Sequence, residues 1–323
     1  MIVRRVRSKM QLLRYPFLAH PGFTSQSERI ALYRFLKNKK SWLEANDLCC
    51  VEFGPFLGSS TVALAEGLKN TQIPIIALDA FCFNKSTSFA RYVMRILENN
   101  GISLSELSQD GDMYLFKSLF DLLCSPYESI RAYKFDVIQN ISLSLPLNGK
   151  KCGFAHIDLP KTMDLGKPIF NSLADTLAPR STIVLQDFAY RWSSELIIFS
   201  MILLANGARC IQMVGPSLYL ELEAPAKTLH SSISAYDGIV RAVDKESIET
   251  LLLNALVLAG QRADAVRYNE IALSCLIMYK NLDLSNNFKE SLGFKLNPKT
   301  FTSLLMSLED IFLHGGLLER SFN

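Results

Sequence analysis

The chain lacks a strong excess of charge and any apolar run long enough to cross a bilayer. Its 323 residues include 34 basic and 31 acidic side chains, a net charge of +3. So small an excess gives no general case for a nucleic-acid partner. The longest apolar run, 196–205, is about half the length that a membrane-spanning helix needs. We therefore expect neither a nucleic-acid partner nor a membrane span.

A paired-cysteine pattern is also missing, and we expect no signal peptide. The seven cysteines are scattered without a C-x-x-C pair, which argues against a disulfide framework and a thiolate zinc site and indicates a reducing compartment. The basic N-terminus is interrupted by Arg14, Pro16 and Pro21 before an apolar stretch forms, and no small-residue cleavage site follows. We expect residues 1–24 to be a solvated basic arm and the protein to be cytoplasmic.

Hydrophobic residues make up 49% of the chain, enough for a substantial core. In the middle of the chain, short β-branched or apolar runs alternate with longer helical patterns, which is typical of βαβ units around a mainly parallel sheet. Gly215-Pro216-Ser217 is too short for a crossover, so the last two strands should form an antiparallel hairpin. We expect strands at 48–53, 75–79, 132–137, 152–158, 182–187, 209–214 and 218–222. We expect helices at 27–46, 60–68, 89–98, 112–123, 168–177 and 193–205.

Helical periodicity dominates after about residue 234. Two long helical patterns meet at Gly260-Gln261-Arg262, which is typical of an αα-hairpin. We expect an α/β domain at 25–225 and a helical C-terminal extension at 226–323. The apolar faces of the extension favour packing or a homo-oligomer over a chemical role.

A glycine-rich turn follows the first expected strand. Gly54 and Gly58 allow a tight turn and the close approach of a ligand, while Ser59 and Ser60 stand where the next helix offers unpaired N–H groups. The spacing E-x-G-x-x-x-G differs from the dinucleotide pattern G-x-G-x-x-G. Glu52 suits a ligand with an ammonium or sulfonium group better than a pyrophosphate. An ordinary glycine turn between a strand and a helix is the alternative.

The next expected strand ends at Asp79, some twenty residues after the turn. A carboxylate there can accept hydrogen bonds from both hydroxyls of a ribose. A capping role is the alternative, but the glycine turn, the spacing and the acid together favour a nucleoside site.

These motifs resemble the class I S-adenosylmethionine-dependent methyltransferases. VEFGPFLGSSTVALA is similar to their first motif and ALDAF to their second, and in IRAYKFDVIQN Asp136 stands where the family has an adenine-contacting acid. The stretch from GFAHIDLPK to STIVLQDF resembles the macrocin-type sugar O-methyltransferases. RCIQMVGPSLYLELE matches their reversed last strand. The resemblance covers about 25–223 and implies a Rossmann-like seven-stranded sheet, last strand antiparallel, with helices on both faces and S-adenosyl-L-methionine at the carboxyl ends of the strands.

Two acids mark the expected acceptor side. Asp158 ends the fourth expected strand and Asp187 the fifth, so both should face the crevice above the sheet. Two carboxylates there could hold Mg²⁺, which would orient an acceptor hydroxyl and lower its pKa. Metal-dependent relatives have Asp-Gly-Asp where this chain has Asp158-Leu159-Pro160, so the second acid of that motif is missing.

Two residues are candidates for the base that deprotonates the acceptor. The Asp-x-x-Lys spacing of Asp158 and Lys161 resembles catechol O-methyltransferase, whose lysine is the general base; a solvated loop lysine is the alternative. His156 lies on the same strand face as Asp158 and is the second candidate, with a hydrogen-bonded core histidine as its alternative.

The sequence therefore predicts an O-methyltransferase acting on a hydroxyl of a sugar, a glycan or a secondary metabolite. Tyr190, Arg191 and Trp192 would line the acceptor entrance or pack on the C-terminal helices, and whether His20 closes over the site is left open. A binding or scaffold protein that keeps the fold without acceptor chemistry is the alternative from another class. A nicotinamide-dependent oxidoreductase is the third alternative, and it is disfavoured because the glycine spacing differs from the dinucleotide pattern.

Overall fold

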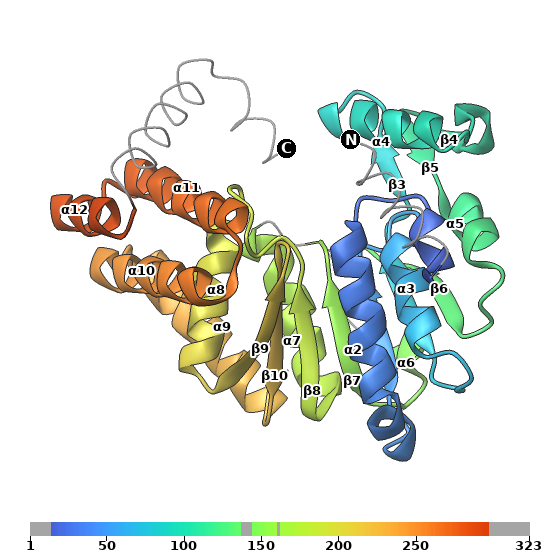
Figure 1. Cartoon of the computed structure of the whole chain (residues 1–323), viewed down its shortest axis with the longest axis horizontal. Coiled ribbons are helices and arrows are strands. Elements are labelled where there is room, and N and C mark those ends of the chain that lie inside the picture. The colour runs from blue at the N-terminus through green and yellow to red at the C-terminus, as the bar shows by residue number, and fades with distance from the viewer. Residues whose placement is uncertain (1–13, 137–143, 160–161, 297–323) are drawn as a thin grey trace. The chain divides into compact units, whose positions relative to one another are not determined.

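The computed structural model describes residues 14–136, 144–159 and 162–296 (Figure 1). Contacts between residues divide the chain into two compact units. The first contains residues 1–158 and 176–181, and the second contains 159–175 and 182–323. Each unit is described in turn.

The strand order is that of the predicted fold. The main sheet has seven strands in the order β6-β2-β1-β7-β8-β10-β9, six parallel and the last of the chain antiparallel. Helices surround it, and further helices follow at the C-terminal end. The fold prediction is confirmed. The strands are β1 (Cys49–Phe53), β2 (Ile75–Asp79), β6 (Ile130–Lys134), β7 (Cys152–Ile157), β8 (Leu177–Leu185), β9 (Ala208–Val214) and β10 (Ser217–Leu222).

In the first unit, β1 lies between β2 and β7 and is buried along its whole length. Burial on both faces is why β1 and β7 consist almost entirely of apolar residues. Helix α2 (Gln26–Ala45) packs on this sheet through Phe35, whose ring lies 5.8 Å from that of Phe154 in β7. Ser25 and Glu28 begin α2 with a capping box. The other helices of this unit are η1 (Pro16–Ala19), α3 (Ser59–Gly67), α4 (Ser88–Asn99), η2 (Leu104–Glu106), α5 (Lys117–Cys124) and α6 (Ser144–Leu147).

The stretch between β2 and α5 was predicted only in part: the helix expected at 89–98 is present, but a small sheet was not predicted. The stretch contains α4 and a three-stranded antiparallel sheet in the order β3-β5-β4, formed by β3 (Cys82–Asn84), β4 (Ser108–Asp110) and β5 (Met113–Leu115). The helix expected at 112–123 is therefore wrong over its first residues. Gly111, at φ 52°, forms the turn that pairs Asp110 with Met113, and α5 begins only at Lys117. Three-residue strands are too short to show a periodicity in sequence.

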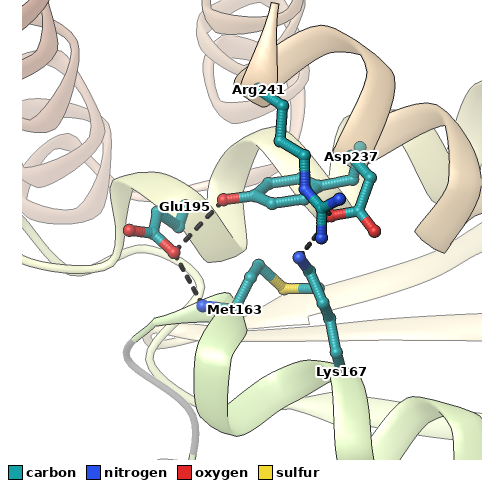
Figure 2. Close-up of polar contacts among 6 residues, drawn as sticks. Met163, Lys167, Glu195, Asp237 and Arg241 are labelled. Carbon is teal, nitrogen blue, oxygen red and sulfur yellow. Dashed lines mark hydrogen bonds and ion pairs between the residues drawn. The ribbon is translucent and has the colours of Figure 1, made fainter.

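The second unit begins near α7 (Met163–Thr176), which starts five residues before the expected 168. Pro168 favours a helix start, yet it lies inside α7. Figure 2 shows the reason: Glu195 accepts a hydrogen bond from the backbone N–H of Met163 at 2.7 Å. The same carboxylate oxygen accepts another from the hydroxyl of Tyr236 at 3.2 Å. A carboxylate from a distant helix thus caps the first turn of α7.

C-terminal helices pack around α8 (Ser194–Ala205) in this unit. Helices α9 (Pro225–Arg241), α10 (Lys245–Arg262) and α11 (Ala265–Leu282) all contact α8, and α12 (Asn286–Lys295) packs on α11. The predicted αα-hairpin is present, but residues 260–262 are the last of α10, and Ala263 and Asp264 form the turn to α11. Lys167 of α7 pairs with Asp237 of α9, and Arg241 lies 3.7 Å from the same carboxylate (Figure 2). No helix among the described residues is long and apolar enough to span a bilayer.

Candidate active site

The loop from β1 to α3 has an unusual backbone. Gly54, Phe56 and Gly58 all have positive φ, at 79°, 48° and 91°. The loop is fixed at both ends, since Gly54 N–H bonds to Leu78 O at 2.9 Å and Gly58 N–H to Pro55 O at 2.8 Å. Gly58 is the N-cap of α3 and has no side chain to cap it. The loop therefore presents the N–H groups of the first turn of α3, as an anion-binding loop does.

Close packing by the protein itself requires glycine at position 58. A Cβ there would lie 2.6 Å from Cys124 Sγ and 3.1 Å from Phe120 Cε2, both on α5. The glycine therefore allows α5 to approach the loop, whatever it also allows a ligand to do.

The segment before α2 covers the other side of the loop. His20 Nε2 lies 2.8 Å from Leu57 O, and Arg29 donates to His20 O at 2.8 Å. Burial lowers the pKa of His20, so the neutral ring donates this bond to the carbonyl. Gly22 presses on Ser59, because a Cβ at Gly22 would lie 2.2 Å from Ser59 Oγ. Ser59 and Ser60 are consequently buried beneath a segment whose position the sequence left open.

Asp79 connects the loop to the end of β2. Its carboxylate accepts hydrogen bonds from the N–H of Phe81 at 2.8 Å and of Phe56 at 3.3 Å. Burial raises the pKa of Asp79 to about 6, although the two hydrogen bonds oppose the shift. Each carboxylate oxygen keeps further acceptor capacity. The capping role is therefore present, and the ribose contact stays a prediction.

Glu52 and His156 form a buried pair on neighbouring strands. They are register partners in β1 and β7, and Glu52 Oε1 lies 3.0 Å from His156 Nδ1. Both residues are 0% exposed. Burial alone would lower the pKa of His156, but the hydrogen bond and charge of Glu52, with the charges of Asp158 and Glu28, outweigh it and raise that pKa. Sequence reasoning selected both residues for separate roles and did not foresee their contact.

An aromatic cluster covers this end of the sheet, and sequence reasoning missed it. Phe56 stacks on Phe23 with ring centres 4.6 Å apart, and Phe23 stacks on Tyr92 of α4 at 5.1 Å. Phe116 meets both Phe56 and Phe81 edge-on. The available signal was the concentration of aromatic residues just after β2, in AFCFN and again in MYLF.

The predicted acceptor residues are spread over both units. Asp158 directly follows β7, and its N–H bonds to Phe53 O at 2.9 Å. Asp136, which the resemblance assigns to the adenine and not to the acceptor, follows β6 and is half-buried. Asp187 lies in the second unit, two residues after β8, at φ 60°. Lys161 falls outside the described residues. No group of three or more His, Cys, Asp or Glu side chains that could hold a metal occurs among the described residues.

Arg191 packs on the C-terminal helices. Its guanidinium binds Glu270 of α11 through Nε at 2.8 Å and a second nitrogen at 2.5 Å, and its backbone N–H bonds to the same carboxylate at 3.2 Å. Of the two roles that the sequence left open for this residue, the structure shows the packing role.

The sequence matches no protein-family model and no curated protein. Its structure is similar to solved O-methyltransferases at low identity. With an O-methyltransferase from Bacillus cereus in complex with SAH the identity is 13%, the likeness covers 66% of this chain and 89% of that one, and the TM-score is 0.39. TomG from Streptomyces achromogenes in complex with SAM is an O-methyltransferase involved in tomaymycin synthesis. The identity with it is 14%, the likeness covers 62% of this chain and 81% of that one, and the TM-score is 0.38. With the O-methyltransferase NovP the identity is 8%, the likeness covers 59% of this chain and 78% of that one, and the TM-score is 0.40.

Likenesses at these identities and TM-scores carry no argument about activity. The fold class rests on the chain's own strand order and reversed last strand. That architecture is a Rossmann-like, seven-stranded α/β fold with a glycine loop and an acid at the carboxyl ends of two neighbouring strands.

Proposed function

We propose that this protein is an S-adenosylmethionine-dependent methyltransferase that methylates a hydroxyl oxygen. One observation carries the proposal: the hydrogen bond between Phe56 N–H and Asp79 joins the glycine loop to the strand-end acid within one unit. The glycine loop and the strand-end acid, the two parts proposed to bind a nucleoside, are thereby neighbours in space. The sequence contains no G-x-G-x-x-G pattern that would favour a dinucleotide instead.

The described residues fit the cofactor in charge. Glu52 has a buried oxygen, Oε2, without a hydrogen-bond partner, which suits an ammonium group. Asp79 keeps acceptor capacity for ribose hydroxyls, and Asp136 is assigned to the adenine. Gly54, Gly58, Ser59 and Ser60 would surround the amino-acid end. When bound, the cofactor supplies a methyl group already activated by its sulfonium.

The chain's own work would be to align the acceptor, exclude water and remove a proton. The acceptor hydroxyl would give up its proton to a base of the chain when its oxygen takes the methyl group. Lys161 is proposed as the first candidate base and His156 as the second. A Mg²⁺ ion would serve the same end by lowering the pKa of the hydroxyl.

The acceptor is proposed to be a sugar, glycan or secondary-metabolite hydroxyl, on the resemblance to the macrocin-type group. A cytoplasmic location, the absence of a nucleic-acid partner and a homo-oligomeric state remain part of the proposal. The domain boundaries at 24/25 and 225/226 likewise remain predictions.

Calorimetric titration tests the proposal. S-adenosylmethionine and S-adenosylhomocysteine are titrated into wild type, Asp79→Asn and a control, Asp112→Asn, with NAD as the control ligand. Asp112 is exposed in the turn before β5, so its loss should leave binding unchanged. We expect micromolar binding of both adenosyl ligands, weakened about tenfold or more by Asp79→Asn. Binding of NAD alone, or of no ligand, would contradict the proposal.

A non-catalytic binding protein is the second candidate, and the enclosed glycine loop favours it. His20 and Gly22 cover the loop from one side and α5 from the other, while Asp79 already caps the loop. Binding of S-adenosylmethionine without methyl transfer to any acceptor in a panel of sugars and phenols, with and without Mg²⁺, would support this candidate. Turnover on any of them would eliminate it.

A further inference from the structure

A large aromatic side chain is exposed on helix α4 of the first unit. Tyr92 keeps 57% of its surface exposed. Its ring lies nearly parallel to that of Phe23, at 6° and 5.1 Å, and Phe23 stacks in turn on Phe56 of the glycine loop at 4.6 Å. The column of rings therefore holds Tyr92 in place while much of its side chain faces solvent. A ring that is fixed before binding loses little conformational freedom when a ligand stacks on it.

Two arginines accompany Tyr92 on the exposed face of α4. Arg91 and Arg95 are one helical turn apart, and Arg95 is three residues after Tyr92, so the three side chains are neighbours on the helix surface. Both arginines are exposed, and neither makes a hydrogen bond or an ion pair with another described residue. Glu98 is the one acid of this helix, and it is exposed as well. The face thus offers two guanidinium groups that are available to an anion.

An aromatic ring beside two arginines matches a ligand that combines a planar base with phosphate groups. An exposed aromatic side chain recognises a base by stacking, and a guanidinium group can donate two parallel hydrogen bonds to a phosphate. A single nucleotide fits better than a nucleic-acid strand, because a strand needs a longer basic groove and the net charge of the whole chain is only +3. Packing of the helix does not require this face, since α4 is buried through the opposite one: Ala90, Val93 and Leu97.

We propose that the exposed face of α4 binds the nucleotide of a nucleoside diphosphate sugar, with Tyr92 stacking on the base and Arg91 and Arg95 binding the diphosphate. The column of rings joins α4 to the glycine loop, so the attached sugar would lie near the proposed cofactor site. That this sugar is the methyl acceptor rests on the proposed function. The inference narrows the acceptor from any sugar, glycan or secondary metabolite to a sugar activated by a nucleotide.

Calorimetric titration of the full chain tests the inference. The probes are UDP-glucose and ADP-glucose, which differ in the base, glucosyl phosphate, which has no base, and uridine, which has no phosphate. The variants are Tyr92→Leu and a double variant that combines Arg91→Gln with Arg95→Gln. Tyr133→Leu and Arg131→Gln are the matched controls, because they remove an exposed tyrosine and an exposed arginine from β6 in the same unit. All of these side chains are exposed, and thermal melting confirms that each variant folds.

We expect wild type to bind at least one nucleotide sugar with a micromolar dissociation constant, about tenfold or more tighter than glucosyl phosphate. Tyr92→Leu should weaken the nucleotide sugar about tenfold and leave glucosyl phosphate nearly unchanged, because it removes only the stacking. The double arginine variant should weaken the nucleotide sugar and glucosyl phosphate alike, by about tenfold or more, and uridine little. The two β6 controls should bind all four probes as wild type does.

Three results would overturn the inference. The first is that wild type binds neither nucleotide sugar, and the second is that the β6 controls weaken binding as much as the α4 variants do. The third is that a long uridine oligonucleotide binds much more tightly than either nucleotide sugar, which would indicate a single-stranded nucleic acid as the partner.

Parallel titration of S-adenosylhomocysteine separates this inference from the proposed function. Tyr92→Leu should bind it as tightly as wild type does. A tenfold loss in that variant would place the ring in the cofactor site and so contradict the inference. Absence of S-adenosylhomocysteine binding by wild type would instead overturn the proposed function, and the nucleotide-sugar titrations would still decide whether α4 binds a nucleotide.

Discussion

At the residue scale, Asp79 both caps backbone N–H groups and makes the stability of the fold depend on pH. Its carboxylate holds two backbone N–H groups of neighbouring loops, and burial raises its pKa to about 6. In the unfolded chain the same group titrates near 3.8. Between these values the native protein holds a proton that the unfolded chain has lost. The stability of the fold should therefore decrease as pH rises through this window.

We predict that this loss amounts to about 2–3 kcal/mol between pH 4 and pH 7 and is absent in Asp79→Asn. The substituted amide keeps an acceptor for one loop N–H but turns its NH₂ group toward the other, so the variant should also be about 1 kcal/mol less stable at pH 5. Urea unfolding at a series of pH values measures both effects, with Asp112→Asn as the exposed control. Parallel pH profiles for wild type and Asp79→Asn would contradict the assignment.

The individual site residues were easier to select from the sequence than their contacts. Glu52, Gly54, Gly58 and Asp79 could be found because a strand end followed by a glycine turn and, about twenty residues later, by an acid is a local pattern. That Glu52 meets His156 could not be found, because it depends on the register of two strands about a hundred residues apart. The fit of Gly22 against Ser59 is likewise a tertiary contact with no local signature.

At the element scale, the junction of the glycine loop with α3 depends on α5. Gly58 and Gly101 both have positive φ, at 91° and 70°, but a Cβ at Gly101 meets nothing within 4 Å. Gly101→Ala therefore measures only the cost of holding an alanine at positive φ. Gly58→Ala adds to this cost the collision of the new Cβ with Cys124. We predict destabilisation of about 1 kcal/mol for Gly101→Ala and at least about 2 kcal/mol more for Gly58→Ala. Chemical denaturation measures both, and equal losses would show that α5 does not press on the loop.

Elements with strong periodicity were predicted well, and elements defined by distant contacts were not. The seven strands of the main sheet and the helices α2, α3, α4 and α8 were expected to within a few residues, except that β8 begins five residues earlier than expected. The start of α7 was missed because Glu195, thirty-two positions beyond Met163, supplies its cap. The small sheet was missed because three-residue strands contain too little pattern.

At the scale of the whole molecule, the C-terminal helices belong to the same compact unit as β9, β10 and the last residues of β8. Helix α8 is apolar on all sides, and its residues 196–203 are all buried. Helices α9, α10 and α11 each contact it. A helix of this kind cannot present a polar face to water, so its partners are part of its fold.

We therefore predict that a chain ending at residue 224 fails to fold as an independent domain. Removing α9 to α12 would expose the apolar surface of α8, an area large enough to drive aggregation. A chain ending at residue 296 keeps every helix described here and is the matched control. Size-exclusion chromatography and thermal melting of both chains measure the effect: we expect aggregates and no cooperative transition for the shorter chain, and a cooperative transition for the longer one. A monomeric shorter chain that melts cooperatively would instead establish residues 25–225 as a domain in their own right, with the C-terminal helices as an addition to it.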